Sequence, residues 1–168
     1  VLLLPPFYYK NVTDEGVINY YRHLIENVGD NELHYVLYHI PQNTYVPISF
    51  KTIETLLKLY PNNIVGLKDS SGDGERMMKV IKYFNNFSVF CGHDSLALSI
   101  SKRGGAGAIT AGTNVCGKLL SFILKNYKNE NSIKNFNELQ SLLEKIRQVI
   151  TSHEPISLMK AYFSIVDN

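Results

Sequence analysis

The chain has 168 residues, of which 45% are hydrophobic and 19% are charged, and its net charge is +2 at pH 7. This composition is ordinary for a domain that buries a hydrophobic core, and it excludes a disordered chain. The basic residues are dispersed among acidic ones, so no nucleic-acid partner is expected. No apolar run approaches the ~18 residues that a membrane helix needs. Two cysteines, Cys91 and Cys116, are too few for a disulfide framework and favour a reducing cytoplasm.

Five short apolar runs, each typical of a buried strand, alternate with stretches of helical periodicity. The runs are 1–4, 34–40, 63–68, 87–92 and 107–111, and the helical stretches between them are 17–28, 53–60, 77–84 and 96–102. Apolar residues in these stretches recur at the spacing of one helix face. Thr13 is a candidate N-cap for the first helix, and Pro61 ends the second. Alternation of strand and helix predicts parallel strands joined by crossover helices.

The pattern changes after Gly112, where no further strand is expected. Three helices are predicted there, over 119–127, 136–150 and 155–166. Pro155 opens the last helix, and the spacing places Met159, Phe163 and Val166 on the face toward the core. No low-complexity linker separates these helices from the strands, so we expect a single domain.

The alternation of strand and helix fits either an open doubly wound sheet or a closed (β/α) barrel. An open sheet that binds a nucleotide normally carries a glycine-rich loop after its first strand. Here the first strand is followed by the sequence PPFYY at 5–9, and glycines gather near residues 104–112 instead. The nucleotide-binding interpretation is therefore disfavoured.

Lys68 closes the third apolar run and is the most informative residue at a strand end. Folds of the α/β class place their chemistry at the carboxyl ends of strands. Because side chains alternate along a strand, Ile64, Gly66 and Lys68 are predicted to share the inner face, whereas Leu67 faces the helices. Loss of solvation there favours the neutral amine, which can attack a ketone and form a Schiff base. The alternative is a lysine at a strand edge that points to water beside Asp69.

Other strand ends carry polar residues that each allow two interpretations. Tyr38 could relay protons, or it could be a packed aromatic ring. Ser70 and Asp94 could hold substrate hydroxyls, or they could cap the helices that follow them. His39 and His93 lack the spacing of metal ligands, so we expect no metal site.

Five ordered motifs give the chain a resemblance to a known family. They are PFYYK at 6–10, YHIP at 38–41, GLKDSSGD at 66–73, GHD at 92–94 and GGAGAI at 104–109. In order and spacing the motifs resemble the dihydrodipicolinate synthase/N-acetylneuraminate lyase family of class I, Schiff-base aldolases. The resemblance covers essentially the whole chain.

The resemblance implies an α/β fold, the (β/α)₈ TIM barrel, of which this chain would form a part. Residues 1–116 would supply about strands four to eight, and residues 117–168 would supply the C-terminal helical region of the same domain. The family's early loop of Gly-Thr-Thr-Gly-Glu type, which binds the pyruvate carboxylate, has no counterpart in the sequence. We therefore expect strands one to three to lie upstream of Val1.

The same resemblance implies roles for individual residues. Lys68 would form an imine with pyruvate, and Tyr38 would shuttle the proton of the bond being made or broken. The backbone at Ile109 would line the pyruvate site, and Tyr8 would reach the proton relay of a neighbouring subunit. Positions that contact the hydroxylated tail of the substrate in the lyase-type branch are matched by Ser70, Asp94 and Thr110. The resemblance implies no cofactor and no metal, and a cytoplasmic homo-oligomer, a dimer or a tetramer.

Two positions depart from the family pattern. The synthase branch usually has an arginine two residues after the proline of its Tyr-x-x-Pro motif, where it binds the carboxylate of the second substrate. This chain has Asn43 at that place, and a neutral amide cannot form the bidentate charged pair. Tyr45 stands where the family usually has glycine, so the loop after Pro41 is expected to differ in shape.

The expected function is a pyruvate-dependent class I aldolase or lyase that cleaves or condenses 2-keto-3-deoxy sugar acids. The alternative enzyme is 4-hydroxy-tetrahydrodipicolinate synthase, which condenses pyruvate with aspartate semialdehyde. Two non-enzymatic interpretations stay open, namely an idle homologue that binds a keto acid and a half-barrel binding module whose sheet edges need a partner. The presence of both Lys68 and Tyr38 argues against an idle homologue.

Overall fold

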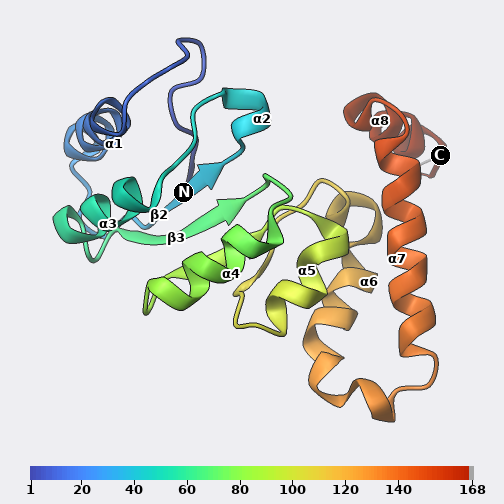
Figure 1. Cartoon of the computed structure of the whole chain (residues 1–168). Helices are drawn as coiled ribbons and strands as arrows, with labels where there is room; N and C mark the ends of the chain where they lie inside the picture. Colours follow the sequence, from blue (N-terminus) through green and yellow to red (C-terminus); the bar gives the residue numbers. More distant parts are fainter. Residues whose placement is uncertain (167–168) are drawn as a thin grey trace.

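A computed structural model describes residues 1–166 of the chain (Figure 1). In chain order its elements are β1 (Leu2–Leu3), α1 (Asp14–Val28), β2 (Tyr35–His39), α2 (Pro41–Thr44), α3 (Phe50–Leu59), β3 (Ile64–Asp69), α4 (Gly74–Tyr83), β4 (Ser88–Cys91), α5 (Asp94–Ser101), β5 (Gly107–Ala108), α6 (Thr113–Asn126), the 3₁₀ helix η1 (Tyr127–Ser132), α7 (Phe136–Thr151) and α8 (Pro155–Val166). Strand and helix alternate as far as β5, and helices follow.

The five strands form one sheet in the order β1-β2-β3-β4-β5, and every neighbouring pair is parallel. Sequential order with parallel pairing places the carboxyl ends of all strands at the same edge. The predicted α/β fold is therefore confirmed, with the sheet of a partial (β/α)₈ barrel. In Figure 1, α1 and α3 lie toward one end of this sheet, and α6 and α7 lie toward the other.

The predicted faces of the third strand need one correction. Tyr35 is paired with Ile64, whereas the next residue of β2, Val36, is paired with Gly66, so the register shifts by one residue. Such an irregularity interrupts the alternation of side chains. Ile64 consequently belongs to the buried cluster that contains Leu67, and it does not share the face of Lys68.

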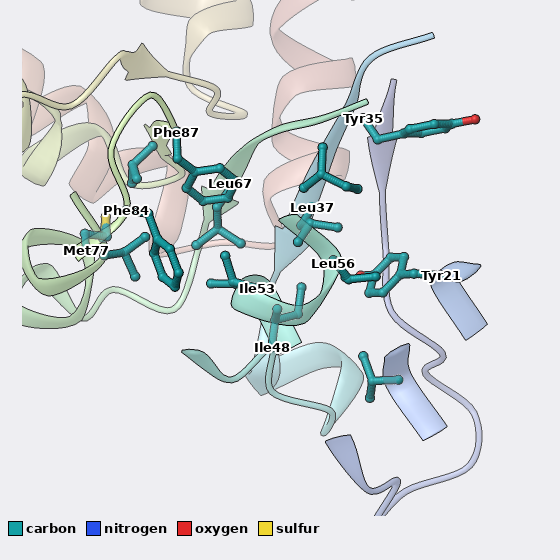
Figure 2. Close-up of a cluster of buried hydrophobic side chains, with 14 of the residues drawn as sticks. Tyr21, Tyr35, Leu37, Ile48, Ile53, Leu56, Leu67, Met77, Phe84 and Phe87 are labelled. Atoms are coloured by element: carbon teal, nitrogen blue, oxygen red, sulfur yellow. The ribbon is translucent and has the colours of Figure 1, made fainter. Parts of the chain in front are cut away.

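The main core lies between the sheet and the helices α1, α3 and α4. Figure 2 shows Leu37 and Leu67 of the sheet beside Ile53 of α3 and Met77 of α4. Caps fix where these helices begin: the hydroxyl of Thr13 accepts a hydrogen bond from an N–H in the first turn of α1, as predicted. Apolar burial on this side leaves the other face of the sheet to the site.

A second cluster joins the helices α5, α6 and α7. Its buried members are Ala97, Leu98, Cys116, Leu120, Ile123, Phe136 and Leu143. Because α5 follows β4 directly, this packing holds the long helix α7 against the end of the sheet. The C-terminal half of α7 thereby reaches the carboxyl edge of the strands.

The last helix forms where predicted, but its expected inward face is wrong at two positions. Phe163 is 37% exposed and Val166 is 57% exposed. In residues 1–166, α8 follows α7 without packing deeply on any other element, so it buries no residue completely. Periodicity alone cannot predict which neighbouring element a helix face will pack against.

None of the helices in the described part of the chain is long and apolar enough to cross a membrane.

Candidate functional site

A cleft of about 540 Å³ lies where the strands β2 to β5 end, and the C-terminal half of α7 forms its opposite wall. Its polar lining consists of Tyr38, Gln42, Asn43, Lys68, Ser70, Ser71, His93, Thr110, Arg147 and Thr151. Lys68 and Arg147 are the charged side chains of this lining. Of the seven residues to which the family resemblance gives a site role, five therefore meet in one cleft, namely Tyr38, Lys68, Ser70, Ile109 and Thr110.

Lys68 and Tyr38 lie side by side on neighbouring strands. They are direct register partners of β2 and β3, so both side chains leave the sheet on the same face. The Nζ atom of Lys68 lies 3.8 Å from the centroid of the Tyr38 ring, and Lys68 is only 9% exposed. None of the ion pairs found in residues 1–166 includes Lys68. The amine thus lies against an aromatic ring in the lining of the cleft, with no ion-pair partner in the described residues.

The buried carboxylate of Asp69 fixes the loop that follows Lys68. Its oxygens accept hydrogen bonds from the N–H and the hydroxyl of Ser71, at 2.9 and 2.6 Å, and from the guanidinium of Arg76. Arg76 also donates to the carbonyl of Ile48 at 2.6 Å. Asp69 therefore serves this network, and within residues 1–166 it forms no ion pair with Lys68, contrary to the strand-edge interpretation.

His39 lies at the end of β2 behind this network. Its Nδ1 atom accepts a hydrogen bond from the N–H of Ile48 at 3.1 Å. Burial, together with the positive charge of Arg76, lowers the pKa of His39 to about 4, so the ring is neutral at pH 7. A neutral imidazole with one nitrogen engaged by the backbone is a structural acceptor that shapes the loop before α3.

Ser70 lines the cleft and is held by three neighbours. Its N–H donates to the carbonyl of His39 at 2.8 Å, and its own carbonyl accepts from Nε2 of Gln42 at 2.7 Å. A β-carbon on Gly92 would lie 2.0 Å from its Oγ atom, so glycine is required beside it. The hydroxyl of Ser70 is thus positioned by backbone contacts from two neighbouring strand ends.

Asp94 lies behind the cleft and not in its lining. One carboxylate oxygen accepts from the hydroxyl of Thr110, and the other accepts from the guanidinium of Arg147 at 2.9 Å. A β-carbon on Gly112 would lie 2.8 Å from the second oxygen, so the carboxylate is also enclosed sterically. Asp94 therefore joins α5, the end of β5 and α7, and it does not cap α5.

Arg147 is a cleft residue that sequence reasoning missed. The inner stripe of α7 runs through Phe136, Leu143 and Ile150, and Arg147 lies on the same side, four residues after Leu143. A charged residue within an otherwise apolar stripe was the available signal, because such a position calls for a buried partner. The partner, Asp94, lies 53 residues away in the sequence.

Three other singled-out residues have distinct environments. Tyr8 is 81% exposed on the loop after β1 and packs edge-on against Tyr9, so it is absent from the cleft lining. Tyr45 ends α2 with a φ of 57°, a left-handed conformation that favours glycine, and its ring lies 4.1 Å below the amine of Lys10. Asn43 lines the cleft, so a neutral amide stands where the family resemblance implies an arginine for the synthase branch.

Two titratable groups near the cleft stay neutral. Burial lowers the pKa of His93, and the charge of Arg147 acts in the same direction. Burial raises the pKa of the Cys91 thiol to about 11. Both cysteines are buried and unpaired in the structure. Within residues 1–166, no three His, Cys, Asp or Glu side chains group as metal ligands would.

A parallel α/β sheet with a buried lysine beside a tyrosine at its strand ends is the arrangement that the family resemblance predicts for this chain. The chain belongs to the dihydrodipicolinate synthetase family, whose model matches residues 1–167. The predicted family resemblance is thereby confirmed.

Individual relatives agree with this family. The chain is 39% identical over 119 residues to an uncharacterised DapA-like lyase of Chloroflexus aurantiacus, covering 71% of this chain and 40% of that protein. It is 34% identical over 153 residues to the 4-hydroxy-tetrahydrodipicolinate synthase of Pelagibacter ubique, covering 90% and 49%. The chain thus spans about half the length of the curated relatives it matches.

Two solved structures share the fold. One is a dihydrodipicolinate synthase from Aquifex aeolicus, with a TM-score of 0.80 and 25% identity over 96% of this chain and 54% of that one. The other is a 2-keto-3-deoxygluconate aldolase from Picrophilus torridus, with a TM-score of 0.67 and 27% identity over 95% and 51%. The fold of this segment therefore occurs both in a dihydrodipicolinate synthase and in a 2-keto-3-deoxygluconate aldolase.

Proposed function

We propose that this chain carries the imine-forming part of the active site of a pyruvate-dependent class I aldolase or lyase. The observation that supports the proposal is the pairing of Lys68 with Tyr38, whose ring centroid lies 3.8 Å from the amine nitrogen at the floor of the cleft. Lys68 is 9% exposed and takes part in none of the ion pairs of residues 1–166, so no carboxylate there holds its amine away from a substrate.

In the proposed reaction the Lys68 amine attacks the keto carbon of pyruvate, and the adduct loses water to give a protonated imine. The imine draws electrons from the adjacent methyl carbon, which releases a proton and becomes an enamine. The enamine carbon attacks an aldehyde, and the phenol of Tyr38 gives a proton to the new alkoxide. Water then releases the product from Lys68, and the cleavage direction reverses each step.

The proposed aldehyde is the hydroxyaldehyde that is released, together with pyruvate, when a 2-keto-3-deoxy sugar acid is cleaved. Asn43 supports this choice, because the cleft offers no arginine there to bind the carboxylate of aspartate semialdehyde. The similarity to a 2-keto-3-deoxygluconate aldolase agrees with it. The second candidate is 4-hydroxy-tetrahydrodipicolinate synthase, which the name of the Pelagibacter ubique relative favours.

The test compares two substrates in the complete natural polypeptide that contains residues 1–168. Cleavage of 2-keto-3-deoxygluconate is followed by pyruvate release, and condensation of pyruvate with aspartate semialdehyde is followed by aldehyde loss. The proposal predicts turnover of the sugar acid at least ~10-fold more efficient than that of the semialdehyde. The reverse preference would select the synthase, and keto-acid binding without turnover of either would select the idle homologue.

We extend the proposal to assembly and location. Tyr8 is exposed in the described chain, and its proposed role in the proton relay of a neighbouring subunit requires a homo-oligomer, either a dimer or a tetramer. The two unpaired cysteines support a reducing cytoplasm as the working compartment. Light scattering on the complete polypeptide, with Tyr8→Ala beside wild type, tests whether this loop joins subunits.

A further inference from the structure

The ion pair between Asp94 and Arg147 has a consequence for which aldehydes can enter the cleft. Asp94 has both carboxylate oxygens engaged, one by Thr110 and one by Arg147, and its side chain is 1% exposed. It cannot turn toward a substrate without breaking both contacts. The side chain of Arg147 is 21% exposed, and Arg147 belongs to the cleft lining.

Arg147 retains hydrogen-bond capacity on the cleft side. A guanidinium carries five N–H donors in a rigid plane, and Asp94 is the acceptor recorded for Arg147 within residues 1–166. The hydrogen bond from one terminal nitrogen to Asp94, at 2.9 Å, anchors the guanidinium beside the cleft. Its remaining donors are available to oxygen atoms of a bound molecule.

Charge balance decides which oxygen atoms suit this position. The charged side chains of the cleft lining are Lys68 and Arg147. The carboxylate of Asp94 already compensates Arg147, and the carboxylate of bound pyruvate would compensate the protonated imine on Lys68. His93 is neutral, and Asn43 and Gln42 carry no charge. A second carboxylate on the aldehyde would find no uncompensated cation among the described lining residues, so its desolvation would not be offset. A hydroxyl group is neutral, and its oxygen can accept hydrogen bonds from Arg147 without burying an unpaired charge.

We propose that Arg147 is the specificity-determining residue of this cleft, binding the uncharged hydroxylated end of the aldehyde, and that Asp94 is its positioning residue. The proposal rests on the proposed aldolase function, and it reassigns the tail contact that the family resemblance gave to Asp94. It predicts that the enzyme discriminates against aldehydes that bear a second carboxylate because of the Asp94–Arg147 pair.

The test measures condensation of pyruvate with two aldehydes, neutral glyceraldehyde and anionic succinic semialdehyde, in the complete natural polypeptide. Wild type is expected to prefer glyceraldehyde by ~10-fold or more in kcat/KM. Asp94→Asn leaves Arg147 with an uncompensated charge, so the preference should shift toward succinic semialdehyde by ~10-fold, the worth of about one charge-assisted hydrogen bond. This gain cannot arise from unfolding.

Arg147→Lys keeps the pair with Asp94 but loses the planar donor array, and it should raise the KM for glyceraldehyde by ~10-fold, with the larger effect on KM than on kcat. Arg103→Lys, an exposed arginine outside the cleft that donates to the carbonyl of Ser99, is the matched control and should keep the wild-type preference.

Three results would overturn the inference. The first is that wild type prefers succinic semialdehyde. The second is that the Asp94→Asn and Arg147→Lys variants keep the wild-type preference and KM while pyruvate still forms its adduct on Lys68. The ion pair of Asp94 and Arg147 would then be only a structural link between α5 and α7. Absence of any pyruvate adduct on wild-type Lys68 would be a different failure, since it would remove the proposed function together with the inference.

Discussion

Gly92 and Ser70 approach each other so closely that a β-carbon on Gly92 would lie 2.0 Å from the Oγ of Ser70 and 2.8 Å from its α-carbon. Because the second atom belongs to the backbone, rotation of the serine side chain cannot relieve the overlap. Gly92→Ala should therefore displace the loop after β3, destabilise the fold by about 1–3 kcal/mol and impair the cleft. Urea unfolding and the rate of pyruvate adduct formation measure the two effects.

Gly117→Ala is the matched control for that substitution. Gly117 lies inside α6, and a β-carbon there would meet only Thr113, at 3.7 Å. Alanine in a helix should stabilise the protein by about 0.5–1 kcal/mol. If both alanine variants had the same stability, close approach at Gly92 would not be what shapes the cleft.

The free energy of unfolding should decrease as the pH is lowered, because of His39. The pKa of this ring is 6.5 in the unfolded chain and about 4 in the fold, mainly because of burial. The unfolded state therefore binds more protons between these values, so the His39 contribution is complete above pH 6.5 and is lost as pH falls to about 4, by roughly 3 kcal/mol. Urea unfolding at several pH values measures this slope.

His39→Asn should flatten that slope, since an amide oxygen can accept from the N–H of Ile48 but cannot take up a proton. His153→Asn, on an exposed residue, serves as the control and should leave the slope in place. A slope that persists in His39→Asn would assign the acid sensitivity to other groups.

The ion pair of Asp69 and Arg76 should behave as a buried pair. Asp69 has a side chain that is 0% exposed and Arg76 one that is 16% exposed. Arg76→Met would leave the carboxylate without its cation and should cost about 3–5 kcal/mol, whereas the double variant Asp69→Asn with Arg76→Met should recover part of this loss.

The control for the buried pair is Arg22→Met, which breaks an ion pair with Glu26 in which both side chains are about half exposed. This loss should stay below ~1 kcal/mol. Equal losses in Arg22→Met and Arg76→Met, measured by urea unfolding, would show that the Asp69 network does not hold the loop.

Asn43→Arg should move substrate preference toward the synthase. Asn43 lines the cleft, and an arginine there could pair with the carboxylate of aspartate semialdehyde. We expect kcat/KM for aspartate semialdehyde to rise by ~10-fold relative to a neutral hydroxyaldehyde, as one charge-assisted pair would provide. Asn114→Arg, on an exposed residue at the start of α6, controls for added charge. An unchanged ratio would mean that position 43 does not select the substrate.

Much of the fold followed from local pattern. The five strands and their parallel pairing come from the alternation of strand and helix, and the face shared by Gly66 and Lys68 comes from the alternation of side chains along one strand. Both patterns depend on neighbours in sequence. The same rule failed at Ile64, because the register shift beside it depends on pairing with Tyr35 of another strand. The predicted burial of Phe163 was wrong for a related reason, since an apolar helix face needs a packing partner to become buried.

The site was predictable only where chemistry and strand ends coincide. Lys68 stands out because an amine at the end of an apolar strand is unusual, whereas the one signal for Arg147 is its place within the apolar stripe of α7. Its significance comes from Asp94, on an element that is far away in sequence. Residues that act through long-range pairs need the tertiary structure to be found.

Borohydride trapping decides whether Lys68 forms an imine with pyruvate. Wild-type polypeptide is incubated with pyruvate and borohydride, digested, and mapped by mass spectrometry, with Lys68→Arg and the exposed Lys58→Arg as paired variants. We expect one reduced pyruvyl group on the peptide that contains Lys68, retained in Lys58→Arg and absent in Lys68→Arg. No modification at Lys68, or equal labelling in Lys68→Arg, would contradict it.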